Sequence, residues 1–212
     1  MKIRKYTGGM VMTNAYLLGE GADCVLIDAP DGVTEWLEQL GELPKEVLLT
    51  HQHYDHVEDV ALLAGKGVRV RAYADYSQDL TLENFRAQWG LPIEVQPYSV
   101  DDVLKNVTSL DSGAYPFRVE HIPGHSTDSI AFITEVTDPS AEGPTTYAFV
   151  GDTLFANSIG RPDLPGGDQD LLLDGIHEKL LCLPDGTRVF PGHGLETTIL
   201  HEKSTNSFIQ RN

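Results

Sequence analysis

The sequence predicts an α/β protein built in layers, and three observations support this. The chain has 212 residues, of which 41% are hydrophobic and 22% charged, the composition of an ordinary globular domain. Short apolar segments rich in β-branched residues alternate with segments whose apolar residues recur at helical spacing. Helices follow strands in both halves of the chain, which is typical of layered α/β folds. No linker or low-complexity tract divides the chain, so we expect one domain spanning residues 1–212.

The expected strands are short apolar runs bounded by Gly, Pro or Asp. They span residues 11–18, 24–28, 46–50, 68–73, 117–122, 129–136, 145–150 and 188–190. The expected helices span residues 33–40, 57–66, 76–89, 169–183 and about 196–203. Helix 57–66 is followed by glycine, and helix 169–183 by Pro-Asp-Gly, both typical of helix ends. Residues 136–145 contain Pro, Gly and Asp and are expected to form a turn between two strands.

Composition excludes several classes of function. The chain has 15 Lys and Arg against 32 Asp and Glu, a formal net charge of −17, which disfavours a nucleic acid or an anionic membrane as partner. No apolar run is long enough to span a membrane, and the charged N-terminus lacks the apolar core of a signal peptide. Cys24 and Cys182 form no disulfide framework. We therefore expect a cytoplasmic protein, either a monomer or a small homo-oligomer.

The densest group of chemically active side chains is T-H-Q-H-Y-D-H at residues 50–56, directly after an apolar strand. Residues two apart in extended chain face the same side, so His51, His53 and Asp55 converge, while His56 faces a second point nearby. Three imidazoles and a carboxylate are costly to bury unless they bind something. Nitrogen and oxygen ligands without cysteine suit zinc, iron or manganese. The alternative is a solvated polar loop.

Three more segments place a ligand-type side chain after an apolar strand and a glycine. They contain Gly124-His125, Gly151-Asp152 and Gly192-His193. Glycine allows the sharp turn that brings the backbone close to a metal, and strand ends at one sheet edge are where α/β folds place their chemistry. Each segment taken singly is better explained by an ordinary turn or a helix cap, and only together with the histidine-rich segment do the three indicate a metal site.

Counting ligands predicts a centre with two metal ions. One ion would take His51, His53 and His125, the other would take Asp55, His56 and His193, and Asp152 would bridge them. Two such ions trap a hydroxide at neutral pH and polarise a carbonyl, so Asp55 and Asp152 become candidate catalytic residues. No nucleophile elbow, P-loop or dinucleotide fingerprint is present as a competing motif. Asp28 ends a strand and is expected to support the histidine loop by a hydrogen bond, although it would equally well start a turn.

With these motifs in order, the chain resembles the metallo-β-lactamase-fold hydrolase superfamily. The matching elements are Asp28, T-H-Q-H-Y-D-H, P-G-H-S at 123–126, G-D-T-L-F at 151–155 and P-G-H-G at 191–194. The resemblance implies a four-layer αββα sandwich with the site at one edge of its two sheets. It also implies the ligand division given above and two divalent metal ions, with zinc expected and iron or manganese as alternatives.

Within the superfamily, the chain is most similar to short, single-domain type II glyoxalases (hydroxyacylglutathione hydrolases). Residues 151–168 and the tail E-K-S-T-N-S-F at 202–208 carry this resemblance. It implies attack of a metal-bridging hydroxide on the carbonyl of a small-molecule thioester such as an S-2-hydroxyacyl thiol. The family places a basic residue at Arg161 to bind the anionic thiol, but its aromatic residue two positions later is Asp163 here. Glu58-Asp59 also departs from the family, which often has a small residue there.

Three other functions remain open. A persulfide dioxygenase of the same superfamily would hold one iron with His51, His125 and Asp152. A lactonase would open a cyclic ester with the same hydroxide. A purely structural metal-binding module is the alternative without catalysis, although structural zinc sites are usually rich in cysteine. β-Lactam hydrolysis is disfavoured because no cysteine occupies a ligand position, and RNA processing is disfavoured by the charge.

Overall fold

The computed structural model describes residues 1–90, 94–137 and 143–210. Its contacts divide the chain into two compact units. The N-terminal unit contains residues 2–106 and 112–114, and the C-terminal unit contains residues 1, 107–111 and 115–212. Each unit is built on one main sheet of six strands, and a separate two-stranded ribbon completes the described strands. The predicted α/β class with two sheets is confirmed.

The sheet of the N-terminal unit has its six strands in sequence order, β1 to β6. They are β1 (Ile3–Gly8), β2 (Thr13–Leu18), β3 (Val25–Ile27), β4 (Glu46–Leu48), β5 (Arg69–Ala72) and β6 (Asp102–Val103). The first three strands pair antiparallel, whereas β3, β4, β5 and β6 pair parallel. Because parallel strands end at the same edge, the residues that follow β3 and β4 emerge side by side.

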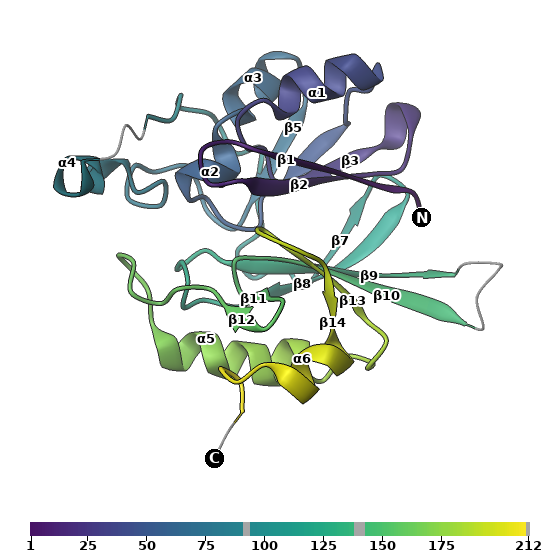
Figure 1. Cartoon of the computed structure of the whole chain (residues 1–212). Coiled ribbons are helices and arrows are strands. Elements are labelled where there is room, and N and C mark those ends of the chain that lie inside the picture. The colour runs from purple at the N-terminus through teal and green to yellow at the C-terminus, as the bar shows by residue number, and fades with distance from the viewer. Residues whose placement is uncertain (91–93, 138–142, 211–212) are drawn as a thin grey trace. The chain divides into compact units, whose positions relative to one another are not determined.

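Helices α1 (Val33–Leu40) and α3 (Val60–Gly65) of the N-terminal unit lie over one face of this sheet (Figure 1). The unit also contains α2 (Tyr54–Val57), α4 (Arg86–Trp89) and the short 3-10 turns η1 (Gly21–Asp23) and η2 (Glu83–Phe85). The core between sheet and helices joins Leu17 and Val47 of the strands to Leu37 and Leu63 of the helices. Each fully buried aliphatic side chain of this kind contributes about 1.5–3 kcal/mol to stability.

The sheet of the C-terminal unit runs in the order β14, β13, β10, β9, β8, β7. The strands are β7 (Ser109–Ser112), β8 (Tyr115–His121), β9 (Ile130–Thr137), β10 (Pro144–Gly151), β13 (Arg188–Pro191) and β14 (Thr197–Thr198), and β11 (Leu154–Phe155) with β12 (Ser158–Ile159) forms the ribbon. Strands β10 and β13 are parallel, and the amide of Gly192 donates to the carbonyl of Gly151 over 2.8 Å. The residues after these strands therefore also emerge at one edge.

Helices α5 (Gln169–Gly175) and α6 (Ile199–Thr205), with the π-helical turn η3 (Ile176–Leu180), lie on one face of this second sheet (Figure 1). Leu172 and Ile176 pack there against Val150 and Ile133 of the strands. Asp168 caps α5, since its side chain accepts a hydrogen bond from the Leu171 amide. Across residues 1–90, 94–137 and 143–210, every helix is too short or too polar to cross a lipid bilayer.

Most predicted elements are confirmed to within a few residues, and three predictions are wrong in detail. The expected helix 57–66 is interrupted at Glu58 and Asp59 between α2 and α3. Only residues 83–89 of the expected helix 76–89 are helical. The expected helix 169–183 changes from α to π geometry after Gly175 and ends at Leu180. Most of the expected turn at 136–145, residues 138–142, lies outside the described residues.

Candidate metal centre

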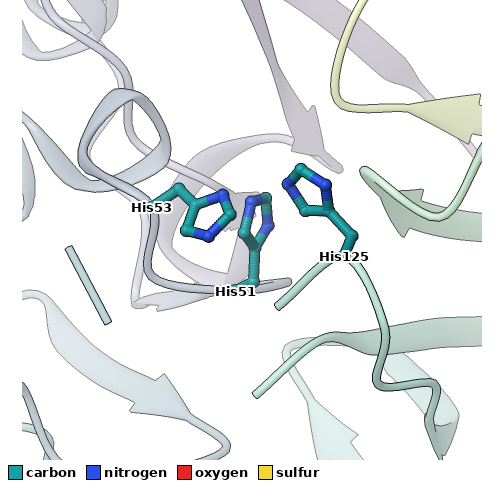
Figure 2. A group of neighbouring side chains, drawn as sticks. All are labelled: His51, His53 and His125. Carbon is teal, nitrogen blue, oxygen red and sulfur yellow. The ribbon is translucent and has the colours of Figure 1, made fainter. Parts of the chain in front are cut away.

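The histidine-rich segment follows β4 in the N-terminal unit and enters α2. Its four candidate ligands are buried: His51, His53, Asp55 and His56 are at most 7% exposed. Figure 2 shows the rings of His51 and His53 rising from the same loop; their centroids are 4.6 Å apart with an edge-to-face angle of 76°. The ring of His56 lies 4.1 Å from that of His51. The N-terminal unit alone therefore gathers three imidazoles and one carboxylate; we call these four residues the first ligand set.

Asp28 fixes this loop by hydrogen bonds to Thr50 and His56. It follows β3, as the histidine loop follows β4, so the parallel pairing brings the two together. Its Oδ1 accepts from the Thr50 amide at 2.8 Å, and its Oδ2 accepts from the Thr50 hydroxyl at 2.7 Å and lies 2.9 Å from Nδ1 of His56. Asp28 has a φ of +57°, a conformation that Asp tolerates better than most residues. The short polar side chain thus suits both the turn and the network.

These contacts fix which ring nitrogen bears the proton. A carboxylate at Oδ2 accepts, so Nδ1 of His56 donates to it. The Thr50 hydroxyl gives its proton to Asp28, so Nδ1 of His51, at 3.3 Å, donates to the Thr50 oxygen. In both rings Nε2 then carries the lone pair that a cation needs, which is the arrangement that orients histidine ligands in metal proteins.

Thr13, at the start of β2, holds the carboxylate of the first ligand set. Its buried hydroxyl donates to Oδ2 of Asp55 at 2.6 Å. A threonine at the start of an apolar strand gives no signal of its own, so this contact could not be predicted from the sequence. Only the fold, which places the start of β2 beside α2, reveals the contact.

The C-terminal unit contributes His125, Asp152 and His193, which we call the second ligand set. They come from three separate loops, after β8, β10 and β13. Nε2 of His125 lies 3.5 Å, and Nε2 of His193 3.3 Å, from Oδ2 of Asp152. His125 and Asp152 are buried, whereas the His193 side chain is 27% exposed. These three predicted residues therefore meet within one unit.

Glycine makes the turn before His125 possible. Gly124 has a φ of +129°, and a Cβ on it would collide with the backbone of Asp168 and Leu172. Beyond the turn, Nδ1 of His125 lies 2.9 Å from the carbonyl oxygen of Arg161. A carbonyl only accepts, so Nδ1 donates, and Nε2 again carries the lone pair.

The spacing of the donor atoms fits a metal ion. Ligands bound to one tetrahedral zinc at about 2.0–2.1 Å are separated by about 3.3–3.4 Å. In the second ligand set the His–Asp donor distances are 3.3 and 3.5 Å, and in the first set Nε2 of His56 lies 3.4 Å from Oδ2 of Asp55. The orienting contacts on the Nδ1 side are shorter, 2.9 Å, as in true hydrogen bonds. All seven predicted ligands are among the described residues that could hold a metal ion.

Arg161 lies beside the second ligand set through its backbone, but its side chain is already paired. Its Nε and Nη2 donate to the two carboxylate oxygens of Asp163, each over 2.8 Å. The hydrogen bonds from Arg161 lower the pKa of Asp163 to about 2. The aspartate that departs from the family pattern is therefore the ion-pair partner of the predicted substrate-binding arginine.

Glu58 and Asp59, unexplained by the sequence, bind the backbone of the loop between β3 and α1 and of the first turn of α1. Oδ2 of Asp59 accepts from the Thr34 amide at 2.8 Å, and its own amide donates to the carbonyl of Ala29. Oε2 of Glu58 accepts from the Asp31 amide at 3.1 Å. Burial raises the pKa of both carboxyl groups above its ordinary value. They act within the N-terminal unit as caps for the backbone of a neighbouring loop.

Comparison with known proteins agrees with this geometry. The family model described as "Metallo-beta-lactamase superfamily" matches residues 8–193. The chain is 32% identical to the "Probable metallo-hydrolase YqgX" of Bacillus subtilis, covering 99% of this chain and 98% of that protein. It is also 32% identical to the "Hydroxyacylglutathione hydrolase GloC" of Haemophilus influenzae, covering 92% of each.

Solved structures share the fold. The "BLEG-1 B3 metallo-beta-lactamase" has a TM-score of 0.84 at 33% identity, covering 99% of this chain and all of that one. "TTHA1623 in a di-iron-bound form" has a TM-score of 0.76 at 35% identity, covering 97% and 99%. "ETHE1 from Myxococcus xanthus" has a TM-score of 0.70 at 27% identity, covering 98% and 84%. The chain belongs to the metallo-beta-lactamase superfamily and is an enzyme of its metallo-hydrolase kind.

Proposed function

We propose that this protein hydrolyses small-molecule thioesters, such as S-2-hydroxyacyl thiols, with two divalent metal ions. The seven ligands would be His51, His53, Asp55 and His56 of the first set, and His125, Asp152 and His193 of the second. The observation that carries the proposal is the geometry of the donor atoms within each set. The histidine Nε2 and aspartate Oδ2 atoms lie 3.3 to 3.5 Å apart. Nδ1 of His56 and of His125 binds a hydrogen-bond acceptor, which leaves Nε2 available for a metal.

Zinc is the proposed metal, because it binds histidine nitrogen and carboxylate oxygen in tetrahedral geometry. Iron is the alternative, and "TTHA1623 in a di-iron-bound form" is a relative for which that metal is named. Bound in this way, a pair of divalent ions makes hydroxide available at neutral pH and polarises a carbonyl. This is the chemistry that a thioester requires.

The chain's own residues would position and deprotonate the attacking water. Asp55, fixed by the Thr13 hydroxyl, and Asp152, placed between His125 and His193, are the carboxylates in the site. In the reaction a C–O bond forms at the thioester carbon and the C–S bond breaks. The water supplies one proton to the leaving thiolate, and the products are a carboxylic acid and a thiol. Sharing of that proton by the two carboxylates is ordinary general acid–base catalysis.

The name of the relative GloC supports a hydroxyacyl thioester as substrate. We also propose that the protein acts in the cytoplasm as a monomer or small homo-oligomer, with no nucleic acid or membrane as partner. The formal charge of −17 and the free thiols of Cys24 and Cys182 support this part of the proposal.

The test is to purify the protein without added metal, determine its metal content, and assay four reactions in parallel. Turnover of S-lactoylglutathione or another lactoyl thioester with two ions per chain supports the proposal. Oxygen uptake with a persulfide and one iron per chain would instead support the dioxygenase, and preferential opening of a lactone or a β-lactam would support those hydrolases.

A variant pair makes the test specific. His125→Ala removes a proposed ligand and should abolish both turnover and metal at its position. His177→Gln removes a histidine from η3, outside both ligand sets, and should leave both unchanged. If His125→Ala unfolds on loss of metal, as judged by circular dichroism, the structural module without catalysis gains support.

A further inference from the structure

The Arg161–Asp163 pair lies next to the proposed reaction centre, and nothing in the proposed hydrolysis requires it. Nδ1 of His125 binds the Arg161 carbonyl at 2.9 Å, so the backbone that carries the guanidinium is fixed directly to a proposed metal ligand. The two side chains project into solvent, 63% and 66% exposed, and form a two-point fork with both N–O distances at 2.8 Å. The pair is thus accessible to a molecule that approaches the second ligand set.

A guanidinium beside a reaction centre would ordinarily bind an anionic group of the substrate by two parallel hydrogen bonds. Here a carboxylate of the chain itself occupies that fork. With a pKa of about 2, Asp163 stays ionised at every pH at which the protein would work, so the pair is permanently close to neutral. An arriving carboxylate would have to displace Asp163 or tolerate its charge, in a chain that already carries a net charge of −17.

We infer that Asp163 is a specificity-determining residue that competes with anionic substrates for Arg161, so that the protein prefers thioesters of an uncharged thiol. This inference rests on the proposed function. It means that glutathione, whose carboxylates make it anionic, is a poor carrier for this chain even where the same acyl group is accepted. The effect is moderate, about a fivefold change in affinity, because both side chains are exposed and water screens the interaction between charges.

The experiment compares two substrates that share an acyl group: S-lactoylglutathione, which is anionic, and S-lactoyl-N-acetylcysteamine, which is neutral. Asp163→Asn keeps the shape of the side chain and removes its charge. We expect it to raise the kcat/KM ratio of the anionic over the neutral substrate by about fivefold, mainly through KM. The gain should shrink in high salt, because the pair is exposed to solvent.

Two further variants make the result specific. Asp185→Asn removes the same charge from another exposed ion pair of the C-terminal unit, Asp185 with Lys203 at 2.6 Å, and should leave the ratio unchanged. The double variant Asp163→Asn with Arg161→Gln should lose the gain, because the gain acts through the guanidinium. An equal gain in Asp185→Asn, or no change of the ratio in Asp163→Asn, would overturn the inference.

A calorimetric measurement of the binding of S-methylglutathione, which is unreactive, separates this inference from the proposed function. If neither thioester is hydrolysed by the unmodified protein, the proposed function is wrong. Tighter binding of S-methylglutathione to Asp163→Asn than to the unmodified protein would still support the role of Asp163. Equal binding to the two proteins would contradict it.

Discussion

The two ligand sets are encoded and supported in different ways. The first set takes four residues from six consecutive positions, and side chains hold it from behind: Asp28 and Thr50 orient the histidines, and Thr13 holds Asp55. The second set collects His125, Asp152 and His193 from three loops between residues 125 and 193, and the backbone supports His125: the Arg161 carbonyl orients its ring, and the turn at Gly124 precedes it. Side-chain substitutions behind the ligands can therefore loosen the first set, whereas no single side-chain substitution removes the backbone carbonyl that orients His125.

The largest effect is expected from Asp152→Ala. The carboxylate of Asp152 lies within 3.5 Å of two proposed histidine ligands of the second set. Removal of a residue that hydrogen-bonds a metal ligand typically lowers metal affinity about 10- to 100-fold. Removal of Asp152, itself a proposed ligand, should lower the affinity by more than that. Metal titration of the metal-free protein checks this. Unchanged affinity would show that the second set binds no ion.

Asp28→Asn should produce the next largest effect. Asn tolerates the positive φ of this position, so the turn is kept, but the negative charge that His56 and Thr50 face is lost. We expect metal affinity to fall about 10- to 100-fold. The metal-free protein should also lose about 1–3 kcal/mol of unfolding free energy, because the amide nitrogen of Asn faces hydrogen-bond donors. Unchanged metal affinity together with that loss of stability would show that Asp28 stabilises the fold and does not support the ligands.

Thr13→Val should produce a smaller loss of metal affinity, about 10-fold, because one hydrogen bond to Asp55 disappears while the volume is kept. Thr13→Ser should restore the affinity. Thr134→Val is the matched control, since Thr134 is also buried in a strand but its hydroxyl has no hydrogen-bond partner among the described residues. Similar losses in Thr13→Val and Thr134→Val would contradict a positioning role for Thr13.

Glu202→Gln should have the smallest effect on metal and a measurable effect on stability. The fully buried carboxylate accepts hydrogen bonds from the Thr197 hydroxyl, the backbone amide of Asn157 and the side-chain amide of Asn206. In Glu202→Gln the NH2 group of the glutamine side chain would face some of these donors, which costs about 1–3 kcal/mol of unfolding free energy. Urea unfolding of the metal-free protein measures this. A loss of metal binding without a loss of stability would contradict this and would show that Glu202 supports the second ligand set.

The first ligand set could be predicted from the sequence because four ligands and their spacing stand in one stretch. Its supports could be predicted only in part. Asp28 ends a strand and was an expected partner, but Thr13 depends on how β2 lies against α2, and no local pattern encodes that. The roles of Glu58 and Asp59 could not be predicted either, because they depend on hydrogen bonds to the backbone amides of Asp31 and Thr34, which lie about 25 positions earlier in the chain.

Failures of the fold prediction have local causes. Strand β1 was missed because charged residues alternate with few apolar ones at an edge of the sheet, where only β2 pairs with it. The helix expected from residue 76 does not form because the Ser77 side chain accepts from the Leu80 amide and Leu82 adopts a φ of +64°. The π turn after Gly175 follows a glycine packed so closely on Ile122 that a Cβ would collide with it.

The most direct test of the central proposal is the metal stoichiometry of the full-length chain. Metal-free protein is titrated with zinc while bound metal is counted per chain, for the unmodified protein, for His56→Ala of the first set and for His193→Ala of the second. We expect two ions per chain in the unmodified protein and fewer than two in either variant. Two ions retained in both variants, or no ion bound by the unmodified protein, would contradict it.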